Sequence, residues 1–160
     1  MANTYTQIHI PLVFAVQNHQ RLIAPVQREE LNKYITGIVR NQRHKLLAIN
    51  CMPDHAHALI GLRPDTALSD LMRDMKACSS AFVNEKKWLG GRFCWQEGFG
   101  AFSYALSDIE RVVRYILQQE EHHRTKTFRE EYLEVLREFQ VEYECKYLFD
   151  WGNRENVEPD

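Results

Sequence analysis

The chain of 160 residues lacks several features that would assign it to a specialised class of protein. Its four cysteines are far apart and form no Cys-x-x-Cys pair, which argues against a disulfide framework and a cysteine metal site. No apolar run approaches the length that crosses a bilayer, and the first residues lack the charged and apolar regions of a secretory signal. No Gly/Ser-rich linker, repeat or low-complexity tract divides the sequence. We therefore expect one cytoplasmic domain over residues 1–160, with no membrane contact.

The chain also lacks a large excess of charge of either sign, because its net charge is only −2. That balance alone argues against nucleic-acid binding, but residues 1–126 carry a net charge of +4 and residues 127–160 one of −6. The core is expected over about 5–150, followed by an acidic tail over 150–160. Two basic clusters lie in the first part: Arg40, Arg43 and Lys45, then Lys86, Lys87 and Arg92. They are candidate DNA phosphate contacts, although solvated surface is the commoner role of such clusters.

The sequence does contain abundant apolar residues, at 44%, and their periodicity predicts both strands and helices. The predicted strands and extended segments cover residues 6–16, 46–51, 55–62, 93–105 and 141–149. The predicted helices cover residues 26–41, 68–82, 107–123 and 128–139. Pro11 indicates an edge or a bulge in the first strand, and Thr66 is a candidate N-cap of the second helix. This order predicts an α+β sandwich, with an antiparallel sheet and helices on its faces.

The most informative segment is Met52-Pro53-Asp54-His55-Ala56-His57-Ala58-Leu59-Ile60. Its first three residues predict the turn of a hairpin. Because His55 and His57 are two residues apart, a strand points both imidazoles to the same face of the sheet. Two such imidazoles can bind one divalent metal ion if a third ligand comes from elsewhere. Two histidines that only pack in the sheet are the simpler case, so the hypothesis depends on finding that ligand.

The helix predicted over 107–123 is the candidate source of the missing ligand. It begins with a capping-box pattern, Ser107-Asp108-Ile109-Glu110. At about 100° per residue, Tyr115, Gln119 and His122 lie along one edge of its apolar stripe. If this helix packs over the two histidines, the carbonyl oxygen of Gln119 can complete a metal site. The Tyr115 phenol can then attack a polarised phosphodiester and form a covalent phosphotyrosine.

The tyrosine and the histidines of this helix also fit roles outside such a reaction. A tyrosine beside an apolar stripe is ordinarily a residue at the edge of the core. His122 and His123 are commonly a solvated helix end, and they could instead complete an all-histidine zinc site with His55 and His57.

Three segments together resemble a known family. Residues 52–60 resemble the His-hydrophobic-His motif of the HUH nucleases. Residues 93–104 and 113–123 resemble the single-tyrosine HUH transposases of the insertion sequence 200/605 kind. Residues 142–149 are similar to the ends of such chains, so the likeness covers about 5–150.

The resemblance implies a homodimer with an RRM-like antiparallel sheet that binds single-stranded DNA hairpins near the ends of a mobile element. It implies Mg²⁺- or Mn²⁺-assisted cleavage of one strand, which leaves a 5′-phosphotyrosine and a free 3′-hydroxyl. In this chain the roles fall on His55 and His57 as ligands, Tyr115 as nucleophile and Gln119 as third ligand. The tyrosine helix of such enzymes can serve the partner subunit's metal site.

Three alternatives remain beside a transposase. The first is a domesticated relative that cuts and joins repeated hairpins without mobilising its own gene. The second is an RRM-like module that only binds single-stranded nucleic acid. The third is a zinc hydrolase that uses His122 or His123.

Overall fold

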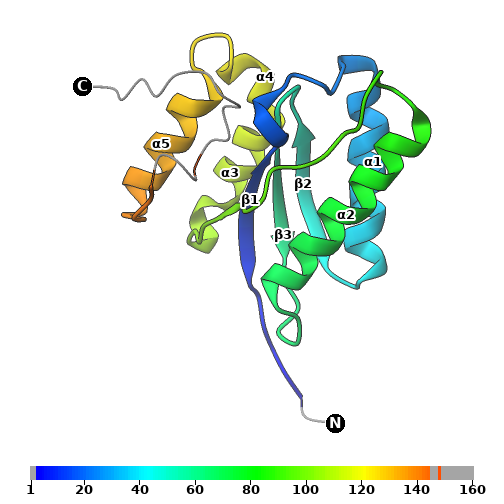
Figure 1. Cartoon of the computed structure of the whole chain (residues 1–160). Helices are drawn as coiled ribbons and strands as arrows, with labels where there is room; N and C mark the ends of the chain where they lie inside the picture. The colour runs from blue at the N-terminus through cyan, green and yellow to red at the C-terminus, as the bar shows by residue number, and fades with distance from the viewer. Residues whose placement is uncertain (1–2, 145–147, 149–160) are drawn as a thin grey trace.

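A four-stranded antiparallel sheet forms the middle layer of the protein. The computed structural model describes residues 3–144 and 148. The strands in chain order are β1 (His9–Ala15), β2 (Lys45–Cys51), β3 (His55–Gly61) and β4 (Gly100–Ala101). Their order across the sheet is β2-β3-β1-β4. Figure 1 labels β1, β2 and β3 and shows β3 between the other two. The predicted hairpin is confirmed, because β2 and β3 are adjacent and joined by residues 52–54.

Helices cover both faces of this sheet (Figure 1). One face carries α1 (Pro25–Asn41) and α2 (Leu68–Lys86). The other face carries α3 (Ile109–Leu117), α4 (Gln119–His122) and α5 (Phe128–Glu138). Two short 3-10 turns are also present, η1 (Gln17–His19) and η2 (Leu106–Asp108). The predicted α+β sandwich with an antiparallel sheet is confirmed.

Side-chain alternation along β3 explains where the two histidines point. Ala56 and Ala58 are fully buried and belong to the core beneath α1 and α2. Leu59 belongs to the cluster on the opposite face, beneath α3. Since successive side chains of a strand point to opposite faces, His55 and His57 share the face of Leu59. The imidazole pair therefore faces α3, α4 and α5.

Two predicted details of the first half are wrong. Pro11 is not in an edge strand, because β1 lies between β3 and β4 in the sheet. The proline is tolerated because its nitrogen faces the two-residue strand β4, where its carbonyl accepts from the Phe102 amide at 3.1 Å. Thr66 is not the N-cap of α2; that position is Ala67, which makes no side-chain capping bond. Burial of the apolar stripe of α2 outweighs the missing cap.

Two predictions about the second half also need correction. The helix expected over 107–123 is interrupted: η2 comes first, α3 ends at Leu117, and Gln118 (φ −102°, ψ 20°) separates it from α4. Its N-cap is Asp108, with no side-chain bond, so the expected capping box is absent. The strand expected over 141–149 is not formed at residues 141–144, and most of the remainder lies outside the described residues. The helix expected over 128–139 is confirmed as α5.

Candidate active site

The two histidines of β3 are buried and close together. Their side chains belong to residues that are 1% and 8% exposed, and the ring centroids of His55 and His57 are 5.1 Å apart. The His55 Nδ1 donates to the Asp54 carboxylate at 2.7 Å. Burial lowers the pKa of His55 in spite of that carboxylate, so the ring is held in the neutral form that binds metal ions. The turn residue Asp54 thus orients the first imidazole.

The free nitrogen of His55 faces an oxygen rather than a donor. With its proton on Nδ1, the ring presents a lone pair at Nε2, which lies 3.3 Å from the Oε1 atom of Gln119. Gln119 is fully buried, and its amide nitrogen donates to the Tyr115 carbonyl at 3.4 Å. Two acceptors that face each other have no hydrogen to share, and a bound cation would satisfy both. The structure therefore places the Gln119 side-chain oxygen beside His55.

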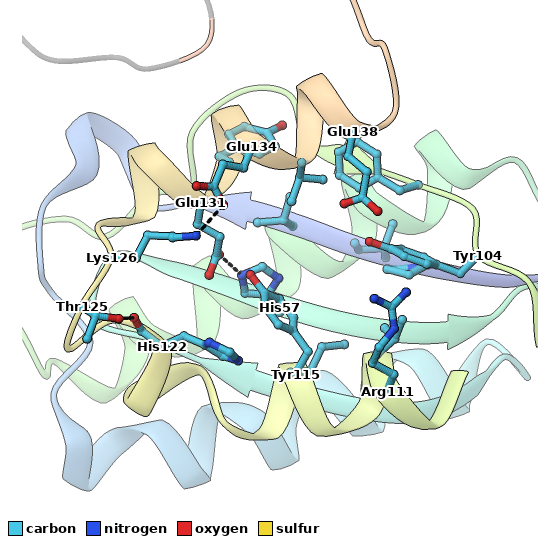
Figure 2. Close-up of a pocket in the computed structure, with 18 residues that line it drawn as sticks. His57, Tyr104, Arg111, Tyr115, His122, Thr125, Lys126, Glu131, Glu134 and Glu138 are labelled. Carbon is cyan, nitrogen blue, oxygen red and sulfur yellow. Dashed lines mark hydrogen bonds and ion pairs between the residues drawn. The ribbon is translucent and has the colours of Figure 1, made fainter. Parts of the chain in front are cut away.

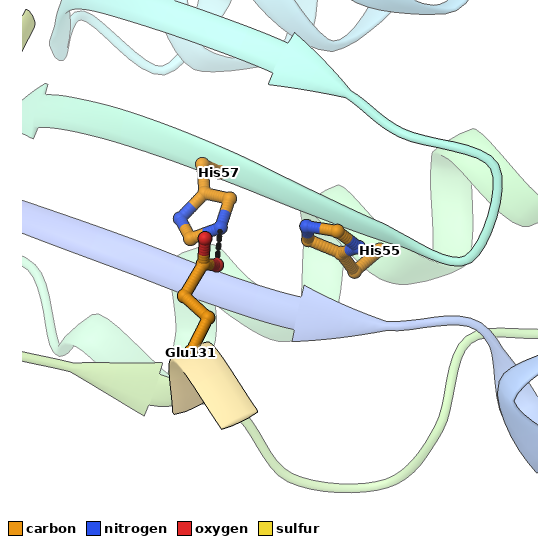
Figure 3. A group of neighbouring side chains, drawn as sticks. All are labelled: His55, His57 and Glu131. Atoms are coloured by element: carbon orange, nitrogen blue, oxygen red, sulfur yellow. Dashed lines mark hydrogen bonds and ion pairs between the residues drawn. The ribbon is translucent and has the colours of Figure 1, made fainter. Parts of the chain in front are cut away.

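A carboxylate that the sequence analysis missed completes the cluster. Glu131 of α5 is buried, and its Oε1 lies 2.8 Å from the Nε2 of His57. Burial alone would raise the pKa of Glu131, but hydrogen bonds from His123 and His57 outweigh it and hold the carboxyl ionised. The ligand atoms of His55, His57 and Glu131 all lie within 4.8 Å of one another (Figure 3). Two imidazoles and one carboxylate are a donor set suited to a divalent transition metal or zinc.

The local signal for Glu131 is present in the sequence. Thr127 and Glu130 form a capping box, in which each side chain accepts from the other residue's backbone N–H at 3.2 Å. This box defines the start of α5 and places Glu131 in its first turn, where the helix dipole favours a carboxylate. The pattern predicts where the helix begins, but it does not predict that the helix packs over β3.

His123 contacts the side-chain oxygens of both Gln119 and Glu131. Its Nε2 lies 2.9 Å from the Gln119 Oε1 and 3.3 Å from the Glu131 Oε2, and its Nδ1 lies 2.9 Å from the Lys126 carbonyl. All three partners are acceptors, so both ring nitrogens must carry protons. Burial disfavours this cation, but the Glu131 carboxylate outweighs burial and raises the pKa of His123. A protonated His123 therefore holds both oxygen ligands in place.

Tyr115 lies against this cluster within the same chain. Its ring centroid is 5.9 Å from that of His57 and 4.6 Å from that of the exposed His122. Burial raises the pKa of the phenol, and its interaction with the Glu131 carboxylate raises it further. The phenol is therefore protonated in this arrangement, and a nucleophilic role requires a group that takes the proton.

The interruption between α3 and α4 brings Tyr115 and Gln119 to the cluster. Asn50 of β2 pairs with His57 in the sheet, and its amide nitrogen donates to the Ile116 carbonyl at 3.0 Å. That carbonyl would otherwise accept from the next helical turn. The bond from β2 therefore stabilises the end of α3 where the helix turns Gln119 into the interior.

A cavity of about 360 Å³ adjoins the cluster, between α3 and α5 (Figure 2). Its floor is formed by β1 and by His57. Tyr115 and Glu131 face it from the two helices. The cluster is therefore open, on the side of His57 and Glu131, to a space that a substrate can enter.

The basic residues that the sequence suggested for DNA contact lie elsewhere. All six are exposed: Arg40, Arg43, Lys45, Lys86, Lys87 and Arg92. Those of the first cluster lie at the end of α1 and the start of β2, and those of the second lie at or beyond the end of α2. None of them lines the cavity, whose basic residues are Arg111 and Lys126. His123 contacts the cluster, but with both ring nitrogens protonated it offers no lone pair for the all-histidine site, and His122 packs against Tyr115 instead.

The family of the chain follows from a match to a family model, which is independent of the site's geometry. The family model described as "Transposase IS200 like" matches residues 4–119, which is most of the chain. The chain belongs to the IS200-like transposase family. Members of this family are transposases, enzymes that cut and rejoin DNA, and the single-tyrosine HUH resemblance found in the sequence is confirmed.

Individual relatives of this IS200-like protein agree with the match. It is 24% identical to the ISDra2 transposase TnpA of Deinococcus radiodurans over 119 residues, which cover 71% of this chain and 84% of that protein. A crystal structure of a candidate transposase from the same organism is similar, with a TM-score of 0.57 and 19% identity over 74% of this chain and 95% of that chain. A REP-associated tyrosine transposase bound to a REP hairpin has a TM-score of 0.58 and 19% identity, over 77% and 73%.

The family match covers only part of the site. It includes His55, His57, Tyr115 and Gln119, but it ends before Glu131. Within the described part of the chain, no helix combines the length and the apolar character that crossing a bilayer requires.

Proposed function

We propose that this protein is a metal-dependent transposase that cleaves and rejoins single-stranded DNA through a covalent 5′-phosphotyrosine at Tyr115. One observation carries the proposal: the Tyr115 side chain contacts both an imidazole and the carboxylate of a buried cluster suited to a divalent metal. A nucleophile beside a metal site is an arrangement suited to metal-assisted phosphoryl transfer to a protein side chain.

The residues of the cluster fit a divalent ion. His55, His57 and Glu131 are the ligands that we propose, with Gln119 as a fourth. Mg²⁺ or Mn²⁺ bound there would polarise the scissile phosphate and offset its developing negative charge. The cluster has one negative charge, so it should bind Mn²⁺ more tightly than a neutral ligand set would. It also leaves room for phosphate oxygens of the substrate.

The chain's own groups perform the transfer. The exposed His122, whose ring centroid is 4.6 Å from that of Tyr115, takes the phenolic proton as the phenolic oxygen attacks phosphorus. A phosphorus–oxygen bond forms to Tyr115, the bond to the 3′-oxygen breaks, and the departing oxygen takes up a proton. The phosphoester retains the energy of the broken bond, so a later 3′-hydroxyl can reverse the attack and join new ends.

The substrate that we propose is single-stranded DNA with a hairpin. The structural neighbour bound to a REP hairpin supports it, and it also supports the domesticated alternative, in which repeated hairpins are processed. A homodimer remains our expectation. Because Tyr115 lies beside His57 of its own chain, cleavage in our proposal does not require the partner subunit's tyrosine.

The test is adduct formation. The protein is incubated with hairpin-containing single-stranded DNA and Mn²⁺ and then analysed on a denaturing gel. We expect a covalent protein–DNA species that Tyr115→Phe abolishes and that Tyr34→Phe, on the opposite face of the sheet, retains. Cleavage without an adduct would support a zinc hydrolase, and binding without cleavage would support the binding module.

A further inference from the structure

The cavity between α3 and α5 extends to both sides of the nucleophile (Figure 2). On one side of Tyr115 lie His122, Thr125 and Lys126. On the other side lie Tyr104 and Arg111. A DNA strand whose phosphate meets Tyr115 must place its two flanking nucleotides on these two sides, so the shape of each side bears on what is recognised.

The lining of the cavity as a whole is chiefly apolar, and Arg111 and Glu138 are the charged residues that lie beside Tyr104. The apolar residues that line the cavity come from β1, α3, α5 and the segment after β4: Leu12, Val13, Phe102, Val112, Ile116 and Val135. A volume of about 360 Å³ falls in the range of small-molecule pockets, roughly 300–1,000 Å³. A flat, apolar-faced group suits such a space better than a hydrated phosphate does. Among the parts of a nucleotide, only the base has that character.

Tyr104 offers the aromatic surface that a base needs. It is half-buried, and its ring packs edge-to-face with Phe139, with centroids 5.0 Å apart and an interplanar angle of 78°. This contact fixes the ring orientation, so stacking costs little side-chain entropy. Stacking on a fixed aromatic ring is the commonest way in which proteins bind unpaired bases.

Arg111 supplies a positive charge beside that surface. It is on α3 four residues before Tyr115, so both side chains lie on the same side of the helix. Its partner is Asp108, at 3.4 Å on the exposed surface, and such an ion pair is weak and easily replaced. A DNA phosphate one nucleotide away from the scissile phosphate is a stronger partner for the guanidinium.

We infer that the Tyr104 side of this cavity binds the unpaired base of the nucleotide adjoining the scissile phosphate. Tyr104 stacks on the base, and Arg111 contacts the next phosphate. The inference rests on the proposed strand-transfer function. It means that the protein itself selects the base next to the scissile phosphate, in addition to recognising the hairpin.

The test uses five small probes and the full chain in Mg²⁺. The probes are the four deoxynucleoside 5′-monophosphates and, as a baseless control, 2-deoxyribose 5-phosphate. Dissociation constants are measured by ligand-observed NMR. We expect at least one nucleotide to bind about fivefold or more tightly than the sugar phosphate, in line with the usual strength of base stacking.

Variants then locate the binding site. Tyr104→Ala should abolish the difference between nucleotide and sugar phosphate, Tyr104→Phe should keep it, and Tyr5→Ala should leave it unchanged because Tyr5 is 90% exposed. Val135→Trp, which fills the cavity, should also abolish the difference and provides a second test if Tyr104→Ala does not fold. Equal binding of all five probes would overturn the inference, and so would an undiminished preference in folded Tyr104→Ala or Val135→Trp.

The two proposals fail in different ways. A base preference without a Tyr115 adduct would retain the binding site and reject the transferase. An adduct without a base preference would retain the transferase and reject the binding site.

Discussion

Replacing Glu131 by glutamine should lower the stability of the metal-free protein and remove its response to Mn²⁺. The carboxylate is buried and ionised, with His57 at 2.8 Å and the protonated His123 at 3.3 Å. Removing one partner of such a buried pair costs about 3–5 kcal/mol. At about 2–4 °C per kcal/mol for a chain of this size, the melting temperature should fall by about 6–20 °C.

Mn²⁺ provides the second, independent measurement in the same experiment. At 100 times its dissociation constant, an ion that binds only the folded state adds about 2.7 kcal/mol. The wild-type melting temperature should therefore rise by about 5–11 °C, and that of Glu131→Gln should rise far less. Both shifts are read by differential scanning calorimetry with and without the ion.

The matched control is Glu134→Gln, one turn of α5 away. Glu134 pairs with Lys126 at the surface, with 55% of its side chain exposed, so its loss should cost only about 0–1 kcal/mol. Its Mn²⁺ response should match that of the wild type. If Glu131→Gln shows the full Mn²⁺ response, Glu131 is not a ligand and the reasoning is refuted.

Three further predictions concern residues in or next to the sheet. Asn50→Leu removes the bond to the Ile116 carbonyl and should slow adduct formation while leaving the Mn²⁺-induced rise in melting temperature intact; an unchanged rate would count against a positioning role. Gly100→Ala should cost about 1–3 kcal/mol in urea unfolding, because a β carbon there would lie 2.7 Å from a neighbouring side chain, whereas Gly90→Ala, with open space around it, should cost far less. Burial lowers the pKa of His44, so the fold favours the neutral ring, and protonation below its ordinary pKa should reduce stability as pH falls. His44→Gln should therefore lose less stability than the wild type between pH 7 and 5 in the same urea assay. Equal losses of stability would contradict this prediction.

The sequence predicted those parts of the site that depend on short-range rules. The turn at residues 52–54 and the alternation of β3 place His55 and His57 on one face without reference to the rest of the chain. Helical spacing correctly associated Tyr115 with His122, whose rings are 4.6 Å apart. In both cases the interacting residues lie close together in the chain.

The parts that the sequence did not predict depend on long-range packing. Nothing between Leu117 and Gln119 marks the end of a helix, since the segment has neither proline nor glycine. The interruption is stabilised by Asn50, which is 66 residues away from its partner in the chain. Glu131 and His57 are 74 residues apart, and no local pattern relates them. Pairing across such distances is decided by how helices pack on the sheet, which periodicity does not encode.

Adding Glu131 to the predicted ligands changes the order in which the site can be filled. With His55, His57 and Gln119 alone, the ligand set is neutral, and a hard divalent ion would bind well only after DNA supplied its phosphate charge. With the ionised Glu131, the set has one negative charge before any substrate arrives. The DNA-free protein should therefore bind Mn²⁺ by itself, and its affinity should drop when Glu131 is replaced by glutamine. A site that binds Mn²⁺ only in the presence of DNA would favour the neutral set and would return the third position to Gln119.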